Sequence, residues 1–496
     1  MSLQFLCPWR RAPGAVLFAV VLLGLLPGEA SRATQPQAAW KELAQSDLDF
    51  IRQELNTLYI SAVFPDGPAF RQRITASYDV AMQEVAQVRD FGGYRAALGR
   101  FVHSMEDDHV GISFTLAQTG FAWPGFMAVY QGRRFLTAAS DGATVADGQE
   151  ITACDGVPMA DWSRRVATYE GGFPGLVRTH GAMARAIFVD RGNPFVTRPA
   201  QCTIGGRSVA LAWRPISAVD YASKIRAQPT TRQREASITP FGADGAWVRM
   251  GYFYRGDKQE ADAFHRLIAD AAGLRQKKVI VLDVRGNGGG TYDWFMGLLR
   301  GLYGQTYADH FARARLAIVP VTRAHERVVA LYGQYHSMED AFRSPVDSAT
   351  EWDPEDRGLK RATAAGSPYF RPAGTPPPGP TGPAPGNPVK AKVYVLTDAG
   401  CGSACIAFVD ELKRIPGVTQ IGTDTGVDSR TGTPISVDLP SGNGQLTVAV
   451  MTRLGRERDD NVPQRPTHEF FGDIRDTAAV RHWIQNEVRV KDGATR

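Results

Sequence analysis

A strand–turn–helix pattern at residues 392–412 constrains the fold of this chain more than any other stretch. It opens with the run Val-Tyr-Val-Leu, which predicts a buried strand. Gly400 and Gly402 then permit a tight turn, and apolar residues at helical intervals follow. Ser403 therefore lies where a strand turns into a helix, and the N-terminus of that helix favours a developing oxyanion. These residues leave two interpretations open: Ser403 is a nucleophile, or it caps the helix.

A glycine-rich turn follows a second apolar run. Residues 278–284 are almost unbroken in their apolar character, which suits a strand covered on both faces of a sheet. The run leads into Gly288, Gly289 and Gly290, whose backbone can approach a ligand closely and direct N–H groups at an anion. The turn has neither the GKS/T ending of a phosphate loop nor the GxGxxG spacing. An oxyanion hole for acyl transfer fits it better, provided that a nucleophile lies nearby.

A third candidate is His109, which follows Glu106, Asp107 and Asp108 at the end of a predicted helix. A neighbouring carboxylate could orient its imidazole and raise its basicity. A histidine at a helix end is also a common structural residue, so the local pattern leaves both roles open.

The hydrophobic pattern divides the chain into segments of different character. Strands and helices alternate over residues 240–300 and 389–470, which predicts an α/β fold. The other segments are a helical region at 38–115, a β-rich region at 116–220, an irregular insertion at 302–388 that ends in a proline-rich loop, and a C-terminal segment at 471–496.

The β-rich region contains short β-like runs, one of which is expected at residues 121–130. Within it, residues 145–158 combine a glycine turn, a strand and an Asp-Gly turn, an order similar to the core of PDZ modules. A generic hairpin explains this segment as well.

Residues 1–30 are predicted to be a signal peptide. Arg10 and Arg11 form a positive region before the apolar run at 14–26, and small residues allow cleavage after Ala30 or Ala33. An uncleaved membrane anchor is the alternative. We expect an exported protein, periplasmic or secreted, with no stable membrane span after cleavage.

Four cysteines then remain. An even number in an exported chain indicates disulfides, and the simplest of the three connectivities joins Cys154 to Cys202 and Cys401 to Cys405. A zinc site is the alternative, but the chain has no CxxC pair. A redox role for the CxxxC pair around Ser403 is another reading. We expect no metal or organic cofactor.

The overall charge does not favour a nucleic-acid partner. The formal net charge is +5 over 496 residues, and there is no dense basic run. The charge therefore points to no nucleic-acid partner, and the oligomeric state stays open.

In this order, the three motifs resemble the S41 peptidase family of tail-specific, tricorn-type and retinoid-binding-protein-type sequences. Residues 283–290 (Asp-Val-Arg-Gly-Asn-Gly-Gly-Gly) look like the family's D-(L/V)-R-x-N-x-G-G signature. Residues 402–405 (Gly-Ser-Ala-Cys) look like its S-A-S nucleophile segment, and residues 106–109 resemble its D-x-H-(T/S) motif. The resemblance implies a crotonase-like ββα spiral core, with the helical region and a degenerate PDZ-like domain attached.

The resemblance also implies catalytic roles. In tail-specific members a lysine base lies about twenty-five residues after the serine, and here Asp428 occupies that position. The chain is therefore closer to the tricorn-like branch, which uses a histidine. We expect Ser403 to be the nucleophile and His109 the general base.

The remaining site residues follow from the same resemblance. The oxyanion donors map to the backbone N–H groups of Gly288 or Gly289 and of Ala404. For the acid that orients the histidine, the segment at 453–463 offers Glu457 ahead of two aspartates, Asp459 and Asp460.

These expectations describe an exported serine-type endopeptidase that hydrolyses peptide bonds through an acyl-enzyme. The alternative from another class is a non-catalytic binding protein on the same fold, for apolar or peptide ligands. Acyl transfer of another kind, such as ester hydrolysis, also stays open.

Overall fold

The computed structural model describes residues 37–490, apart from residues 65–66, 117, 119, 144, 233–234, 254–257, 317, 333–352 and 374–381. All described residues belong to one compact unit, Gln37–Arg496. The signal peptide expected at residues 1–30 lies outside the described residues, and so does part of the proline-rich loop. Within the described part, no helix is both long and apolar enough to cross a bilayer.

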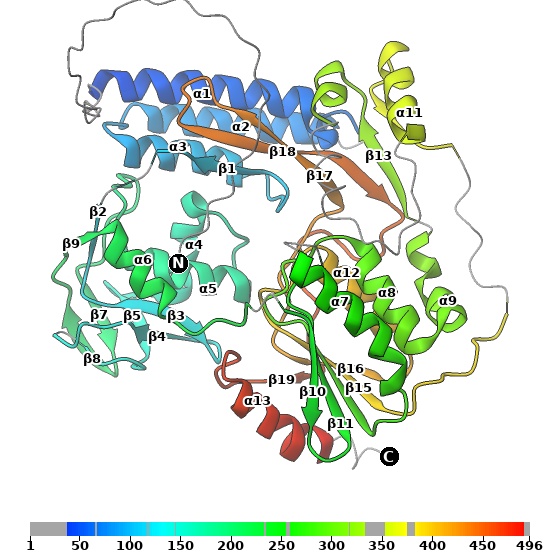
Figure 1. Ribbon diagram of the computed structural model, residues 1–496. Coiled ribbons are helices and arrows are strands. Elements are labelled where there is room, and N and C mark those ends of the chain that lie inside the picture. The colour runs from blue at the N-terminus through cyan, green and yellow to red at the C-terminus, as the bar shows by residue number, and fades with distance from the viewer. Residues whose placement is uncertain are drawn as a thin grey trace, which may run out of the picture. The chain divides into compact units, whose positions relative to one another are not determined.

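A six-stranded sheet organises the α/β region (Figure 1). Its order is β10-β11-β12-β15-β16-β19, and all neighbouring pairs are parallel except β10–β11. The strands are β10 (Ser237–Phe241), β11 (Gly245–Arg249), β12 (Val279–Asp283), β15 (Lys392–Thr397), β16 (Val418–Gly422) and β19 (His468–Glu469). The mixed α/β character expected from the sequence is confirmed.

Helices cover both faces of this sheet (Figure 1). Ile280 of β12 joins one hydrophobic core and the next residue, Val281, joins another, because successive side chains of a strand point to opposite faces. The run at 278–284 is almost entirely apolar for this reason. The first core holds α7 (Lys258–Asp270), η2 (Ala271–Leu274), α8 (Tyr292–Tyr303) and α12 (Ala404–Arg414), and the second holds α13 (Thr477–Trp483) and η3 (Ile484–Val488).

The N-terminal helices share a core with a second sheet of five strands. In that sheet β18 lies at the centre and pairs antiparallel with β1, β13 and β17. The elements are α1 (Gln37–Leu58), η1 (Ile60–Ala62), α2 (Gly67–Val85), α3 (Phe91–His103), β1 (Gly111–Phe114), β13 (Val319–Arg323), β14 (Tyr369–Phe370), β17 (Thr431–Asp438) and β18 (Gly444–Leu454). The helical region that carries His109 is thereby joined to chain segments more than 300 residues further on.

The stretch after residue 302 is more ordered than the sequence indicated. Its described residues include α9 (Gln305–Leu316), β13, α11 (Asp353–Ala364) and β14. The expectation of an irregular insertion was wrong for these residues. β13 pairs with β18, and such long-range pairing has no local sequence signal.

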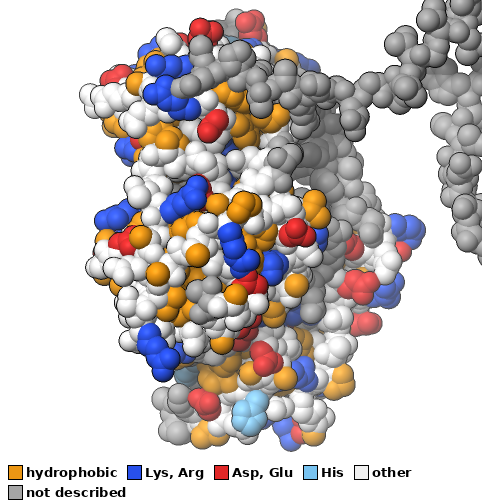
Figure 2. Space-filling view, turned by 90° about the vertical axis from the view of Figure 1, so that its left-hand side faces the viewer, with side chains coloured by type: hydrophobic (Ala, Val, Ile, Leu, Met, Phe, Trp, Pro, Cys, Tyr) orange, Lys and Arg blue, Asp and Glu red, His pale blue; other side chains and the backbone are white. Residues whose placement is uncertain are grey.

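The β-rich region consists of small sheets with three helices (Figure 1). The single run expected at residues 121–130 is two strands, because Pro124 has no N–H group and Gly125 has a φ of +95°. On the face seen in Figure 2, basic and acidic side chains are interspersed with hydrophobic ones. The elements are β2 (Gly120–Trp123), β3 (Met127–Gln131), β4 (Arg134–Ala138), β5 (Ile151–Cys154), β6 (Val157–Pro158), α4 (Met159–Glu170), α5 (Val177–Ile187), β7 (Gln201–Ile204), β8 (Arg207–Ala210), β9 (Arg214–Ser217) and α6 (Ala218–Arg226).

A disulfide joins two neighbouring strands of this region. Cys154 of β5 and Cys202 of β7 are register partners, and their sulfur atoms are bonded. Both side chains are buried in the region's own core.

Candidate active site

Ser403 occupies a strained turn between β15 and α12. Its φ is +50° and its ψ is −119°, a backbone conformation that residues with a Cβ rarely adopt. Its side chain makes no capping hydrogen bond to the helix, so the helix-cap interpretation finds no support in the structure. Such strain costs on the order of 1–3 kcal/mol and persists where the surrounding fold holds it, often at functional sites. Within the part of the chain that the structure describes, the Ser403 hydroxyl is therefore not used by the helix and can serve another role.

The glycine turn after β12 lies directly against Ser403. A Cβ on Gly289 would stand 2.9 Å from the Ser403 Cβ and 2.7 Å from the Gly402 oxygen, and its φ is +106°. Only glycine fits this position without a shift of the backbone. The two turns meet because β12 and β15 are parallel neighbours, so their carboxyl ends lie at the same edge of the sheet.

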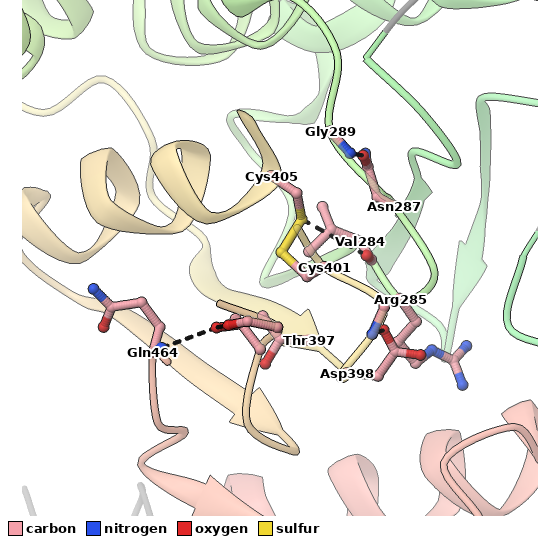
Figure 3. Close-up of a disulfide and its surroundings, with 12 residues drawn as sticks. Val284, Arg285, Asn287, Gly289, Thr397, Asp398, Cys401, Cys405 and Gln464 are labelled. Carbon is pink, nitrogen blue, oxygen red and sulfur yellow. Dashed lines mark hydrogen bonds between the residues drawn. A yellow bond between two sulfur atoms is a disulfide. The ribbon is translucent and has the colours of Figure 1, made fainter. Parts of the chain in front are cut away.

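Two of the three expected oxyanion donors have uncommitted N–H groups. Among the residues that the structure describes, neither the Gly288 N–H nor the Ala404 N–H donates a hydrogen bond. The Gly289 N–H instead donates to the Asn287 Oδ1 at 2.9 Å (Figure 3). Gly288 and Ala404 are therefore better placed than Gly289 to receive a charged oxygen.

Buried carboxylates hold these turns in place. Asp398 Oδ1 accepts the N–H groups of Gly286 (2.8 Å) and Gly400 (2.9 Å), one from each turn. Asp283 accepts hydrogen bonds from the guanidinium groups of Arg249 and Arg285, and the three side chains form an almost fully buried cluster of ion pairs. The Asp and Arg of the D-V-R-G motif are therefore structural residues beneath the site.

A disulfide brackets the nucleophile turn (Figure 3). Cys401 and Cys405 are bonded to each other on either side of Ser403, and both are fully buried. The Cys401 oxygen accepts the Gly426 N–H at 2.8 Å. The disulfide thus braces the turn, which in turn contacts the segment at 426–429.

His109 lies at the other end of that segment. Its Nδ1 is 3.3 Å from the Ser429 Oγ, 3.5 Å from the Thr431 Oγ1 and 3.6 Å from the Asp107 Oδ1. The histidine reaches these partners because β1, which follows it, pairs with β18, and β18 pairs with β17, which begins at Thr431.

Asp107 is the acid beside this histidine. It is buried and accepts hydrogen bonds from Ser429 (2.6 Å), Thr431 (2.6 Å) and the hydroxyl of Tyr59. Its Oδ1 also accepts the backbone N–H of His109 at 2.9 Å. Burial opposes ionisation, but the histidine and the two hydroxyls outweigh it and hold the pKa of the Asp107 carboxyl below its usual range.

Glu457, the acid favoured from the sequence, lies elsewhere. Its side chain is 71% exposed and forms an ion pair with Arg414 at 2.7 Å. Within the described residues, no hydrogen bond or ion pair joins it to His109. The aspartate two positions before the histidine was the available signal, whereas Ser429, Thr431 and Tyr59 come together only through the fold.

Asp428 stands where tail-specific members of the family carry a lysine base, and its carboxylate is already paired. Asp428 forms ion pairs with Arg456 at 3.0 Å and with Arg458 at 2.6 Å, and all three side chains are largely buried. No amine is therefore supplied to Ser403 from this position.

Ser403 and His109 are far apart in the sequence, but the turn that holds Ser403 and the side chain of His109 contact opposite ends of one short segment, residues 426–429. No hydrogen bond between them is present among the described residues. Gly426 contacts the nucleophile turn and Ser429 contacts the histidine, and three residue steps span at most about 11 Å. Catalytic hydrogen bonds are often long in a protein without its substrate.

Metal chemistry has no evident site in the described part of the chain. No group of three or more His, Cys, Asp or Glu side chains there is arranged to hold an ion. The four cysteines pair with one another instead.

The family comparison covers this site. Residues 244–458 match the model of Peptidase family S41, and the matched segment includes both the glycine turn and Ser403. This domain match confirms the resemblance at the level of the family domain and supports a serine-type peptidase acting on peptides or proteins. Comparison with curated proteins gave no significant match.

Solved structures show the same fold. Mature CPAF complexed with lactacystin is similar with a TM-score of 0.57 and 15% identity, covering 92% of this chain and 99% of that one. A structure of mature CPAF alone has a TM-score of 0.56 and 15% identity, covering 91% and 97%. At this identity the likeness concerns the fold.

Proposed function

We propose that the chain is an exported serine peptidase, periplasmic or secreted, in which Ser403 attacks a peptide bond and His109 acts as the general base. The observation that carries this proposal is the strained turn at Ser403, with an uncapped hydroxyl against a glycine turn. The match of this segment to an S41 peptidase model supports the reaction class.

The geometry supports a mechanism with a histidine base. Nδ1 of His109 faces the Asp107 carboxylate, which leaves Nε2 to take the proton from the Ser403 hydroxyl. The serine oxygen bonds to the carbonyl carbon, and the resulting oxyanion is stabilised by the N–H groups of Gly288 and Ala404. His109 then gives the proton to the leaving amine, and a water molecule, activated in the same way, hydrolyses the acyl-enzyme.

Two features favour the histidine-using branch over a Ser–Lys dyad. The lysine position is Asp428, held by two arginines. His109 has a buried, ionised acid beside it, as a base that must carry a positive charge requires.

We further assign the parts of the chain to roles. Residues 240–300 and 389–470 form the catalytic core, taken as a crotonase-like ββα spiral, and residues 116–220 form a degenerate PDZ-like domain. The helical region at 38–115 supplies the base, and the described parts of the insertion at 302–388 and of the C-terminal segment at 471–496 pack against these regions. The four-stranded sheet β6-β5-β7-β8 with α4 and α5 supports a separate module at 116–220.

Labelling with a fluorophosphonate probe tests the nucleophile. The wild type is expected to form an adduct that mass spectrometry locates on Ser403, and the variant Ser403→Ala is expected to lose it. Ser436→Ala, on an exposed part of β17, is the matched control and keeps the adduct. Equal labelling of Ser403→Ala and the wild type contradicts the proposal. A folded wild type that cleaves nothing in a peptide library but carries a co-purified apolar ligand favours a binding protein instead.

A further inference from the structure

A cavity of about 390 Å³ has three walls formed by elements that also lead to the candidate active site. Tyr292, at the start of α8, forms one wall and lies two residues after Gly290 of the glycine turn. α12 forms the second wall through Ala407, whose N–H donates to the Ser403 oxygen. Arg453 of β18 forms the third wall.

The second wall continues the helix face that begins at Ser403. Ala407, Asp410 and Arg414 line the cavity, at positions four, seven and eleven after the serine. Residues with this spacing lie on one face of a helix. A substrate chain bound at Ser403 and running along this face would place a side chain or its end in the cavity.

The third wall is linked by hydrogen bonds to Asp107, the acid beside His109. Arg453 Nη1 donates to the Thr431 backbone oxygen at 2.8 Å, and the Thr431 hydroxyl donates to Asp107. One wall of the cavity is therefore a single helical turn from Ser403, and another is linked to Asp107 through Thr431.

The acidic side chains that line the cavity are all paired with arginines, but not every basic side chain there is paired with an acid. Every acidic side chain in the lining has an arginine partner within 3.2 Å. In the described part of the structure, Arg453 forms no ion pair, and Lys413 contacts only the Gln464 amide. These acidic residues are Asp410, Glu411, Asp428 and Glu457, against the basic residues Lys413, Arg414, Arg453, Arg456 and Arg458.

Arg453 has the capacity for a further bond. A guanidinium has five N–H donors, and the described structure gives this one a single hydrogen bond, to Thr431. It is half-buried and lies 5.9 Å from the centre of the Tyr292 ring, a position in which solvent screens its charge only in part. A planar guanidinium so placed matches the two oxygens of a carboxylate.

We propose that this cavity binds a carboxylate of the peptide substrate and that Arg453 is its main ligand. The inference rests on the proposed peptidase function and names a specificity for it. The carboxylate belongs either to an acidic side chain near the cleaved bond or to the free C-terminus of the substrate, and both sources present the same group to the guanidinium.

Paired peptides test this inference. A peptide that the wild type cleaves is resynthesised with Glu or Gln at each position in turn, and with a free or an amidated C-terminus. In one of these pairs the wild type is expected to prefer the carboxylate by about 10- to 100-fold in kcat/KM, the range for a charged hydrogen-bonded pair. The pair that shows the preference identifies the source of the carboxylate.

Variants assign the preference to Arg453. In Arg453→Met the ratio is expected to fall to about one, and in Arg453→Lys to an intermediate value because lysine is a single-point donor. Arg430→Met is the matched control, since Arg430 is exposed, pairs with Asp460 and does not line the cavity; it keeps the wild-type ratio. Because the readout is a ratio, a general loss of rate in a variant does not affect it.

Two results overturn the inference: equal rates on both members of every pair, or an unchanged ratio in both Arg453 variants. Binding of the same pairs to Ser403→Ala, followed by fluorescence anisotropy, separates this inference from the proposed function. Arg453-dependent binding of the carboxylate member by a protein whose wild type cleaves nothing would refute the peptidase and support the cavity. Equal binding of both members would refute the cavity.

Discussion

Replacing Asp107 by asparagine tests the whole catalytic arrangement. The substitution keeps the size and one oxygen of the side chain but removes its charge. Its hydroxyl partners on Tyr59, Ser429 and Thr431 can rotate to accept from the new amide, so we expect the fold to persist.

The expected effect follows from the distance between the acid and the imidazole. In the transition state His109 is positively charged, with its Nδ1 3.6 Å from the Asp107 Oδ1. Two unit charges at that distance attract by about 4–5 kcal/mol at an effective dielectric constant of about 20. Each 1.36 kcal/mol is a factor of ten in rate, so kcat is expected to fall about a thousandfold. KM should change little, because the charge on His109 exists only after the proton is transferred.

The assay compares kcat, KM and the rate of fluorophosphonate labelling in three proteins. Asp108→Asn is the matched control, because Asp108 is the neighbouring residue, pairs with Arg178 and, within the described residues, forms no hydrogen bond or ion pair with His109. Thermal unfolding confirms that both variants are folded. A loss smaller than about tenfold in Asp107→Asn, or equal losses in the two variants, would refute the role of Asp107.

Two further predictions concern the glycine turn beside Ser403 and the two disulfides. Gly289→Ala places a Cβ within 2.7 Å of the nucleophile turn, so kcat is expected to fall about 100-fold, as for the loss of an oxyanion donor, and a near-normal kcat would contradict the close contact. Loss of the Cys154–Cys202 disulfide, in a double Ser variant, is expected to cost about 4 kcal/mol of unfolding free energy, because it closes a loop of 48 residues. The Cys401–Cys405 disulfide closes a loop of only four residues, so its loss in the corresponding double Ser variant is expected to cost about 2 kcal/mol of unfolding free energy. This second variant is nevertheless expected to show the larger fall in the rate of probe labelling. Denaturant unfolding and labelling kinetics measure the two effects, and the reverse order of either would contradict the argument.

Local pattern was enough to predict the elements around Ser403. The unbroken apolar run before the glycine turn indicated a strand buried on both faces, and β12 has that burial. The turn at Ser403 could be predicted because its glycines, the strand before it and the helix after it are all adjacent in sequence. Only the strained φ of Ser403 needed coordinates.

Residues that act through long-range pairing could not be predicted in this way. The choice of Glu457 ahead of Asp459 and Asp460 used distance along the chain from the nucleophile, whereas the fold brings residues together by strand register. His109 meets Ser429 across 320 positions because β1, β18 and β17 are neighbours in one sheet. β13 was missed for the same reason, since its partner strand lies more than 120 residues away.

The position of Asp428 supports the proposal that the base comes from the N-terminal region. A lysine at 428 would stand beside the guanidinium groups of Arg456 and Arg458, which lie within 3.0 Å of the present carboxylate. Like charges in such a buried cluster are strongly unfavourable, even though Asp410 and Asp460 would still pair with Arg458 and Arg456. The arginine cluster and a lysine base therefore exclude each other at this site. The proposed proton acceptor for Ser403 is therefore His109, beside which the fold holds the buried carboxylate of Asp107.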